Sequence, residues 1–364
     1  MDNDWRHGGF GLYIHWPFCE AKCPYCDFNS YVNLNVDAQV WEDALISELD
    51  RNAKFTSGRL LNSIFFGGGT PSLMPPSLVE KLISRAYEHW MPANDIEITL
   101  EANPSSVEAE RFSGFKTAGV NRVSVGIQAL NNPDLKKLGR LHSVDDAMLA
   151  LEVAHRHFDR VSFDLIYGRQ NQSLSSWETE LTRAISLNSG HLSLYQLTIE
   201  PGTAFGYRAN AGKLTGLPNE DLSADMFEFT DTACALAGLN SYEVSNFSSE
   251  GLESKHNLIY WMGGDYIGVG PGAHGRITSG NQRLATKTML SPAAWLDAVH
   301  LKSSGELAPD ILSNTDHANE LIMMGLRLKS GISQSRLEAV VGKKFDITTE
   351  LTDLGLLNIS DGFI

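Results

Sequence analysis

The feature that most constrains the fold is a regular alternation of predicted strands and helices between residues 11 and 200. Six segments are rich in β-branched or aromatic residues, as strands are. Five segments between them have helical apolar spacing, and several begin at Ser or Asp, which favour helix N-caps. This order forms parallel βαβ units, which build either a barrel or an open doubly wound sheet. The predicted strands are 11–16, 63–68, 95–101, 122–128, 160–168 and 191–200, and the predicted helices are 37–53, 77–90, 106–119, 143–158 and 174–188.

Polar residues at the strand ends decide between these two architectures. In a (β/α) barrel, the carboxyl ends of all strands meet at one mouth, whereas an open sheet concentrates function at its switch point. Here every predicted strand is followed by polar or glycine-rich residues, which favours the barrel. Because only six units are visible, we predict an α/β fold with a partial (β/α)6 barrel. The strand-end segments are 19–26, 67–72, 101–104, 126–128, 164–168 and 200–203.

The regular alternation of predicted strands and helices ends at about residue 215. We predict three regions: the partial barrel in 1–215, a barrel extension in 216–305, and a small, mainly helical, winged-helix-like domain in 306–364. Residues 331–345 have helix-turn-helix character, which admits DNA binding, but packing is the preferred interpretation. The further predicted elements are helices at 219–238, 314–328 and 333–342, a strand at 241–248, a stretch dense in Gly and aromatics at 255–277, and a helix followed by one strand within 345–364.

Charge and composition exclude several classes of protein. The formal net charge is −15 with no long Lys/Arg run, which argues against broad nucleic-acid binding. No apolar run is long enough to span a bilayer, and the first ten residues lack signal-peptide features. We therefore expect a cytoplasmic location, where thiols stay reduced and serve more often as metal ligands than in disulfides. The isolated Cys234 is expected to be a core residue.

Three cysteines in the segment CEAKCPYCDF form a candidate metal site. Cys19, Cys23 and Cys26 have the spacing C-x3-C-x2-C, and Asp27 excludes the C-x-x-C-H pattern of covalent haem attachment. Structural zinc needs four ligands, and His15 could supply the fourth. An iron–sulfur cluster is favoured because thiolates bind it. Three protein ligands to a four-iron (4Fe-4S) cluster leave one iron open for another ligand.

This cysteine pattern, placed after the first strand and with Tyr25 before the last cysteine, resembles the radical S-adenosylmethionine (SAM) superfamily. The resemblance implies that the open iron chelates the amino and carboxylate groups of SAM. It also implies that reduction of the cluster can cleave SAM to a 5′-deoxyadenosyl radical.

A glycine-rich turn follows the second predicted strand. The turn consists of Gly67, Gly68, Gly69 and Thr70, and the backbone of the three glycines, which have no Cβ atoms, can approach a ligand closely. Exposed N–H groups in such a turn favour anions. A tight turn without a ligand is an equally good interpretation of this segment alone. Its place one unit after the cysteines resembles the superfamily motif that holds the SAM amino group.

Other strand-end residues complete the candidate SAM site. Glu101 suits a cationic amine or a ribose hydroxyl, and Gln128 and Asp164 could add amide and carboxylate contacts. Arg140 suits the SAM carboxylate because its planar fork pairs bidentately. Tyr13 could pack on SAM or fill the barrel. Any one of these residues alone could equally be structural.

Several segments together resemble the oxygen-independent coproporphyrinogen III oxidase family, from about residue 10 to the C-terminus. They are LYIHWPFCEAKCPYCDFNSY, FFGGGTPS, SVGIQ, DLIYG, YQLTIEPGT and HNLIYW. The family has a decarboxylating dehydrogenase branch and a haem-chaperone branch of the HemW type. Phe28 stands where the dehydrogenase motif has a fourth cysteine, and the first strand begins near residue 11, without that branch's N-terminal extension. HNLIYW matches the H-N-x-x-Y-W motif of the chaperone branch.

The residue types in the HNLIYW motif are suited to binding haem. His256 could be an axial haem ligand, with Asn257 fixing its tautomer. Tyr260 and Trp261 offer flat faces for a porphyrin plane. His274 is a rival ligand, and simple packing remains a serious alternative for all of these residues.

The resemblance implies a haem chaperone with a 4Fe-4S cluster and SAM as cofactors and haem as cargo. Haem-requiring respiratory enzymes would be the recipients, with peripheral membrane association through the recipient and a homodimer as further possibilities. No nucleic-acid partner is expected. The alternatives are a coproporphyrinogen III dehydrogenase or related radical enzyme acting on a tetrapyrrole and, more weakly, a zinc-binding structural module.

Overall fold

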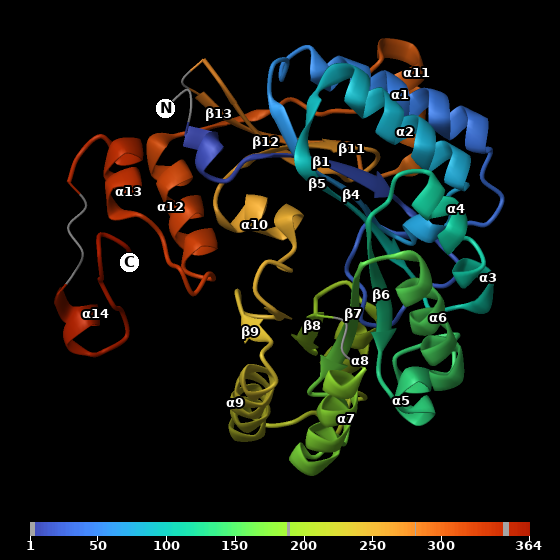
Figure 1. Cartoon of the computed structure of the whole chain (residues 1–364), viewed down its shortest axis with the longest axis vertical. Helices are drawn as coiled ribbons and strands as arrows, with labels where there is room; N and C mark the ends of the chain where they lie inside the picture. The colour runs from blue at the N-terminus through green and yellow to red at the C-terminus, as the bar shows by residue number, and fades with distance from the viewer. Residues whose placement is uncertain (1–3, 188–189, 281, 345–348) are drawn as a thin grey trace.

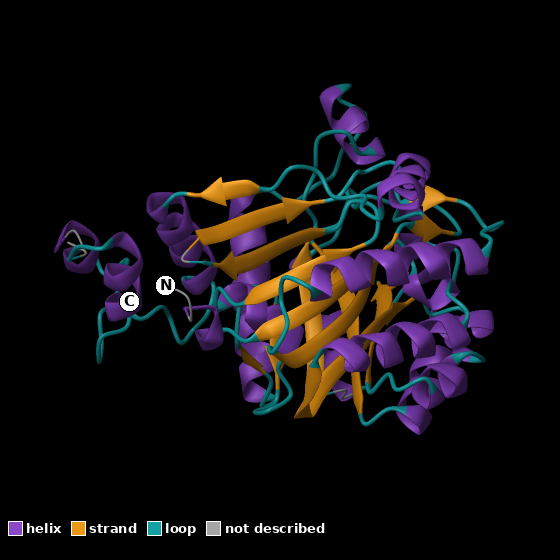
Figure 2. Ribbon diagram, turned by 90° about the horizontal axis from the view of Figure 1, so that it is seen from above, coloured by secondary structure: helices purple, strands orange, loops and turns teal. Residues whose placement is uncertain are grey.

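A computed structural model describes residues 4–187, 190–280, 282–344 and 349–364. Within them, a twelve-stranded sheet curves around a concave interior without closing (Figure 1, Figure 2). The strand order is β14-β13-β12-β11-β1-β4-β5-β6-β7-β8-β10-β9. The predicted α/β partial barrel is therefore confirmed.

The centre of this sheet is parallel. All six predicted strands are present and pair in sequence order, and β11 joins them in parallel beside β1. The glycine-rich sequence gave no expectation of β11. The parallel strands in the described residues are β1 Phe10–Trp16, β4 Leu60–Gly68, β5 Met91–Ala102, β6 Arg122–Gln128, β7 Arg160–Tyr167, β8 His191–Gln196 and β11 Asp265–Val269.

Helices cover the convex face of the sheet (Figure 1). Alternate strand residues such as Leu12 and Ile14 are fully buried there in the main hydrophobic core. Burial of this face is the main stabilising contribution, at roughly 25 cal/mol for each Å² of apolar surface. The helices that follow the parallel strands are α1 Ala38–Ala53, α2 Pro76–His89, α3 Ser106–Ala109, α4 Phe112–Thr117, α5 Asn132–Lys137, α6 Val144–His157 and α7 Leu174–Ser186.

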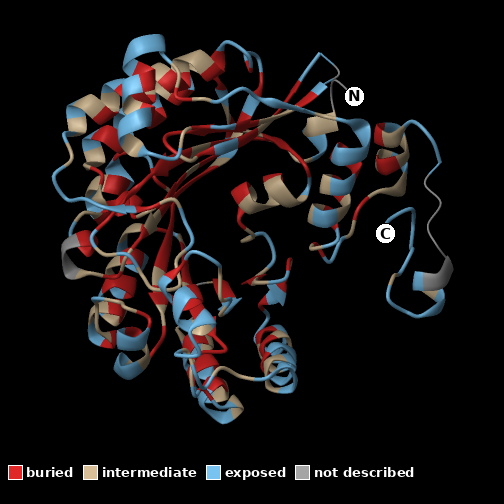
Figure 3. Cartoon of the chain, turned by 180° about the vertical axis from the view of Figure 1, so that it is seen from behind, coloured by how far each residue is buried: buried red, intermediate tan, exposed pale blue. Residues whose placement is uncertain are grey.

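The opposite, concave face is polar. Side chains two residues apart on a strand share a face, so Tyr13 and His15 lie opposite Leu12 and Ile14. Helix α10, Lys255–Trp261, lies in this interior and contacts β1, β4 and β11 (Figure 1). Figure 3 shows the resulting pattern, with buried strands at the centre and exposed residues on the outer helices.

Three element predictions were wrong. The predicted helix 106–119 is two helices, α3 and α4, interrupted where Arg111 turns its guanidinium to the carbonyls of Ser72 and Leu73. The predicted strand 241–248 is an antiparallel pair of short strands, β9 Asn240–Ser241 and β10 Asn246–Ser248. The carboxylate of Glu243 accepts from the Ser245 N–H at 2.8 Å and stabilises the turn between them.

The third error concerns the C-terminal end. The helix expected within 345–364 is present as α14, Thr349–Asp353, but residues 345–348 lie outside the described residues. In 349–364 there is no strand, only isolated bridges such as Ser360 to Phe363. The remaining elements are η1 Asp4–His7, β2 Phe18–Cys19, β3 Tyr31–Val32, η2 Pro71–Leu73, α8 Ala204–Asn210, α9 Glu220–Leu236, β12 His274–Ser279, β13 Gln282–Lys287, α11 Pro292–Lys302, β14 Asp310–Leu312, α12 Asn314–Gly325 and α13 Gln334–Val341.

The C-terminal helices pack against the start of the chain. Arg336 on α13 donates two hydrogen bonds of 2.8 Å to the carboxylate of Asp4. It also donates to the carbonyl of Gly263, just after α10. The three-domain division remains a prediction. In the part of the chain that is described, no helix has the length and apolarity needed to cross a bilayer.

Candidate functional site

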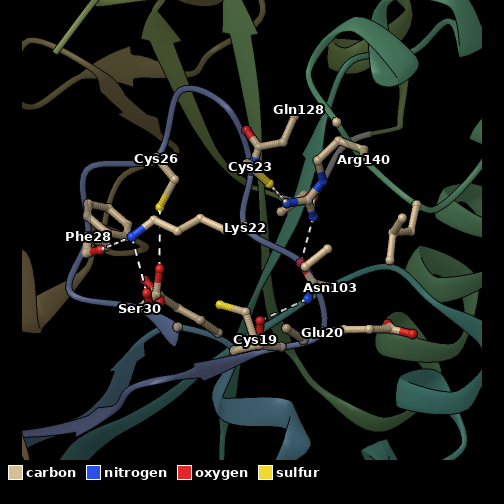
Figure 4. Close-up of a pocket in the computed structure, with 18 of the residues that line it drawn as sticks. Cys19, Glu20, Lys22, Cys23, Cys26, Phe28, Ser30, Asn103, Gln128 and Arg140 are labelled. Carbon is tan, nitrogen blue, oxygen red and sulfur yellow. Dashed lines mark hydrogen bonds between the residues drawn. The ribbon is translucent and has the colours of Figure 1, made fainter. Parts of the chain in front are cut away.

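A cavity of about 170 Å³ opens at the carboxyl ends of the parallel strands (Figure 4). Residues in or after β1, β4, β5, β6 and β7 line it, so five of the six predicted strand-end segments meet here. The sixth, 200–203, contributes to a neighbouring groove instead. The predicted residues that line the cavity are Cys19, Cys23, Tyr25, Cys26, Gly68, Gly69, Thr70, Glu101, Gln128, Arg140 and Asp164.

All three cysteines of the predicted cluster site are free thiols that line this cavity. Lys22 holds their loop in shape by donating to the carbonyls of Phe28 at 3.2 Å and Ser30 at 3.1 Å (Figure 4). In the described residues, no three His, Cys, Asp or Glu side chains converge on a single metal ion. A four-iron cluster presents separate iron corners, so its thiolates need not converge on one point. The donor set therefore fits a cluster better than mononuclear zinc.

The glycine-rich turn packs against the cysteine loop. A Cβ atom on Gly69 would lie 2.7 Å from the carbonyl oxygen of Phe18, and one on Gly68, whose φ is +110°, would lie 2.5 Å from the His15 ring. The N–H of Thr70 donates to Phe18 at 2.9 Å, and the N–H of Gly69 donates to the last carbonyl of β1 at 2.7 Å. The expectation of free N–H groups for an anion was therefore wrong. These glycines allow the two loops to approach each other closely.

Two half-buried carboxyl groups, those of Glu101 and Asp164, lie on the strand side of the cavity. Burial and the nearby Asp164 raise the pKa of Glu101 to about 8, although Glu101 accepts a hydrogen bond from the Gly68 N–H. Burial also raises the pKa of Asp164 to about 6, and Ser124 donates to it at 3.3 Å. Like charges in a buried site disfavour simultaneous ionisation. A cationic ligand, such as the sulfonium and ammonium groups of SAM, would favour the ionised pair.

Arg140 joins the cavity wall to the cysteine loop (Figure 4). Its Nη1 donates to the Cys23 Sγ at 3.5 Å, and its Nη2 donates to the Asn103 Oδ1 at 2.6 Å and to the Gly126 carbonyl at 2.8 Å. Its Nε is buried and has no partner in the described residues. A buried donor without a partner costs about 1–3 kcal/mol. A carboxylate ligand in the cavity would supply the missing acceptor, which fits the predicted role of Arg140.

Gln128 and Tyr25 frame the cavity. Gln128 has a φ of +73°, which is uncommon for a residue other than glycine, and the β6–β7 pairing is irregular just before it. Such backbone is found at ligand sites more often than elsewhere. The Tyr25 ring packs 6.5 Å from the ring of Phe205 on α8.

Tyr13, which was expected to pack on SAM or to fill the barrel, is absent from the cavity lining. Tyr13 lies deeper in the concave interior, where its hydroxyl is 2.9 Å from the His15 Nδ1. The structure therefore favours the barrel-filling alternative for Tyr13. Sequence reasoning missed Asn103 and His142, although Asn103 stands in the strand-end segment EANP and His142 follows Arg140 by two residues.

The HNLIYW segment forms most of α10, away from the cofactor cavity. His256 is 1% exposed, and its Nδ1 and Nε2 lie 2.7 Å from the Ser63 Oγ and 2.6 Å from the Tyr260 hydroxyl. Its ring stacks 4.9 Å from that of Phe65. Burial lowers the pKa of His256 to about 3, so the imidazole is neutral. Both nitrogens are engaged, and an iron atom would have to displace one of these hydrogen bonds.

The other residues of this motif also have protein partners. The two ring nitrogens of His256 lie within hydrogen-bond distance of Ser63 and Tyr260, so the expectation that Asn257 fixes the His256 tautomer was wrong. The Trp261 ring is covered by the guanidinium of Arg327 on the C-terminal side, 4.5 Å from the ring centre. His274, the rival ligand, is exposed at the start of β12.

Comparisons with known proteins agree with this geometry. The Radical SAM superfamily matches residues 13–182, and the HemN C-terminal domain matches residues 312–364. Heme chaperone HemW of Escherichia coli K12 is 39% identical over 343 residues, which cover 92% of this chain and 87% of that protein. The chain belongs to the HemW family of radical SAM proteins. Heme chaperone HemW of Bacillus subtilis is 34% identical and covers 97% of this chain and 93% of that protein.

The chain is also similar to eukaryotic proteins. The mouse protein named Radical S-adenosyl methionine domain-containing protein 1, mitochondrial, is 40% identical over 88% of this chain and 74% of its own length. Among solved structures, the E. coli coproporphyrinogen III oxidase HemN has a TM-score of 0.77 at 21% identity, over 93% of this chain and 81% of that one. HemW-family membership implies a 4Fe-4S cluster and SAM, which the thiols, the acidic pair and the unpaired Arg140 Nε fit.

Proposed function

We propose that this protein is a haem chaperone that binds haem, a 4Fe-4S cluster and SAM, and delivers haem to haem-requiring respiratory enzymes. The observation that carries the proposal is the similarity to the E. coli protein named heme chaperone HemW over nearly the full length of both chains. Phe28, in place of a fourth cysteine, supports the same branch. It is 58% exposed at the rim of the cavity.

The cofactors would be held by residues of the cavity. Cys19, Cys23 and Cys26 would ligate the cluster, Arg140 would bind the SAM carboxylate, and Glu101 would face its cationic groups. When both are bound, the 4Fe-4S cluster and SAM supply the one-electron cleavage of SAM. The protein would orient SAM with the fixed donors and carboxyl groups that line the cavity. In a chaperone, the cluster would serve structure, dimerisation or the gating of haem transfer rather than turnover.

Haem would be ligated by a histidine at or near α10. Ligation by His256 requires Ser63 or Tyr260 to give up its hydrogen bond, so α10 would have to shift. Ligation by His274 requires no such displacement, because this residue is exposed at the first position of β12. These two residues are therefore separate candidates with different structural costs. A cytoplasmic location, a homodimer and membrane association through the recipient remain parts of the proposal.

The second candidate function is a radical enzyme acting on a tetrapyrrole. The cavity holds all the groups that were predicted to face the cluster and SAM, apart from Tyr13, and the Arg140 Nε has no partner in the described residues and could bind a carboxylate. Both observations favour this second function. The test uses anaerobically reconstituted full-length protein with a verified four-iron cluster. Dithionite, SAM and coproporphyrinogen III are added, and protoporphyrinogen IX is measured by chromatography. The chaperone proposal predicts no product, and multiple turnovers would overturn it.

A further inference from the structure

Ser30, just before β3, lies beside two of the three thiols of the cysteine loop. It is 5% exposed and lines the cofactor cavity. Its Oγ is 4.0 Å from the Cys26 Sγ (Figure 4). Burial raises the pKa of the Cys19 thiol, and hydrogen bonds from Thr70 and Ser30 lower it. One buried hydroxyl therefore serves two of the cysteines that would ligate the cluster.

This hydroxyl has no competing acceptor. In the described part of the chain, the Ser30 Oγ forms no hydrogen bond with an oxygen or nitrogen atom. A free thiol can donate to a hydroxyl or accept from it. A thiolate that ligates iron carries no proton, so it can only accept. Cluster binding would therefore fix the direction of the bond, with Ser30 donating to sulfur.

The backbone next to Ser30 is held by segments from elsewhere in the chain. The side-chain amide of Asn29 donates to the carbonyls of Pro271 at 3.0 Å and Leu290 at 2.9 Å. The Asn29 carbonyl accepts from the His15 Nε2 at 2.9 Å. These three hydrogen bonds fix the position of the Ser30 hydroxyl without using it. A donor that is placed in this way needs no rearrangement to meet a bound cluster.

We infer that Ser30 raises the reduction potential of the cluster by donating a hydrogen bond to its thiolates. One-electron reduction adds a negative charge to the cluster, and a donor at the ligating sulfur stabilises that charge. Removing the hydroxyl should therefore make the cluster harder to reduce. The inference rests on the cluster that HemW-family membership implies and not on haem binding, so a failure to bind haem would leave it standing.

The test uses the full-length, cluster-loaded protein, with iron and sulfide measured for every variant. Ser30→Ala removes the hydroxyl. Ser30→Thr and Ser30→Val form an isosteric pair that differs in the hydroxyl, so both share any effect of the added bulk. Ser186→Ala, at an exposed position on α7, is the control. The midpoint potential is measured by anaerobic spectroelectrochemical titration, and the Fe–S stretching bands are measured by resonance Raman spectroscopy.

We expect the ratio of reduced to oxidised cluster in S30A to be about tenfold lower than in wild type at a fixed potential. For a one-electron couple this is a midpoint about 59 mV more negative. S30V should differ from S30T in the same direction, and S186A should match wild type. The Fe–S bands should move to higher frequency in S30A and S30V, because a hydrogen bond to sulfur weakens the Fe–S bond.

Equal midpoint potentials in wild type and S30A, or in S30T and S30V, would overturn the inference. If S30A does not hold four irons, the S30T and S30V pair decides the question. Loss of the cluster from S30V but not from S30T would support a bond from the hydroxyl to these thiolates, because the two side chains have the same shape.

Discussion

The guanidinium of Arg140 donates to the Sγ atom of Cys23 at 3.5 Å, although the two residues are 117 positions apart in the chain. The loop after β6 is thereby joined to the cysteine loop after β1. The same guanidinium holds Asn103, which follows β5. One side chain therefore fixes three of the loops that build the cofactor cavity, and its buried Nε has no hydrogen-bond partner in the described part of the chain.

Replacing Arg140 with Lys should weaken SAM binding by about tenfold or more, because a lysine keeps the charge but loses the planar fork. The loss should appear as a higher SAM dissociation constant in calorimetry of the cluster-loaded protein. It should also appear as a smaller change in the cluster's electron paramagnetic resonance signal when SAM is added. Arg156→Lys, at an exposed position on α6, is the matched control. Unchanged SAM affinity in R140K would show that Arg140 only holds the loops.

The half-buried carboxyl groups predict a pH dependence of stability. The folded pKa of Glu101, about 8, lies above its ordinary value, so the folded state binds more protons than the unfolded state between roughly pH 4.5 and 8. The contribution of Glu101 to the free energy of unfolding is complete below this window and is lost as the pH rises through it. Urea unfolding of the cofactor-free protein should therefore show lower stability at pH 8.5 than at pH 6.

Glu101→Gln isolates this effect, because a glutamine keeps the shape and cannot ionise. We expect the difference in unfolding free energy between pH 6 and pH 8.5 to shrink by about 1 kcal/mol or more in E101Q, since each pKa unit corresponds to about 1.36 kcal/mol. Asp43→Asn, on the exposed face of α1, should leave the difference as in wild type. An identical pH profile in E101Q would contradict the neutral state of Glu101.

Glu48 predicts a large stability effect outside the cofactor site. This carboxylate is fully buried on α1 and accepts from the N–H groups of Gly270 at 2.9 Å and Gly305 at 3.0 Å and from the Trp295 Nε1 at 3.1 Å. Glu48→Ala leaves three buried donors without an acceptor, so we expect it to lower the free energy of unfolding by about 3 kcal/mol or more. Chemical denaturation measures this change.

The control is Glu42→Ala on the same helix, where the partner is the exposed Lys81. Exposed ion pairs contribute about 0–1 kcal/mol, so this variant should stay within that range. Equal losses in E48A and E42A would mean that Glu48 does not anchor the segment after β11.

The parallel strands could be predicted because their sequences carry the signal of burial. Phe10, Leu12 and Ile14 alternate with polar-facing residues, and the strand-end segments already hold most of the residues of the cavity. The sequence could not reveal β11, because it is short and lies among glycines that lower strand propensity. Its own Gly268 is needed where a Cβ would lie 2.2 Å from the His274 carbonyl oxygen.

The roles of individual polar groups were harder to predict than their positions. The glycine-rich turn was expected near the cofactor and is there, but the N–H groups of Gly69 and Thr70 donate to the carbonyls of Trp16 and Phe18, and these contacts depend on tertiary packing. The partners of His256 also depend on tertiary packing. One of its two hydrogen bonds is with Ser63 on β4, which is 193 positions away in the chain. Neither partner choice has a signal in the local sequence.

The central claim is haem binding, and a haem titration tests it most directly. Cluster-loaded, SAM-bound wild type, His256→Ala, His274→Ala and the exposed-site control His300→Ala are titrated with haem and followed by the Soret band. We expect one saturable site in wild type and in H300A, with the shifted Soret band lost in the variant that lacks the axial ligand. Saturable binding that neither H256A nor H274A changes would contradict the assigned ligands. The absence of saturable binding in wild type would contradict the haem-chaperone account itself.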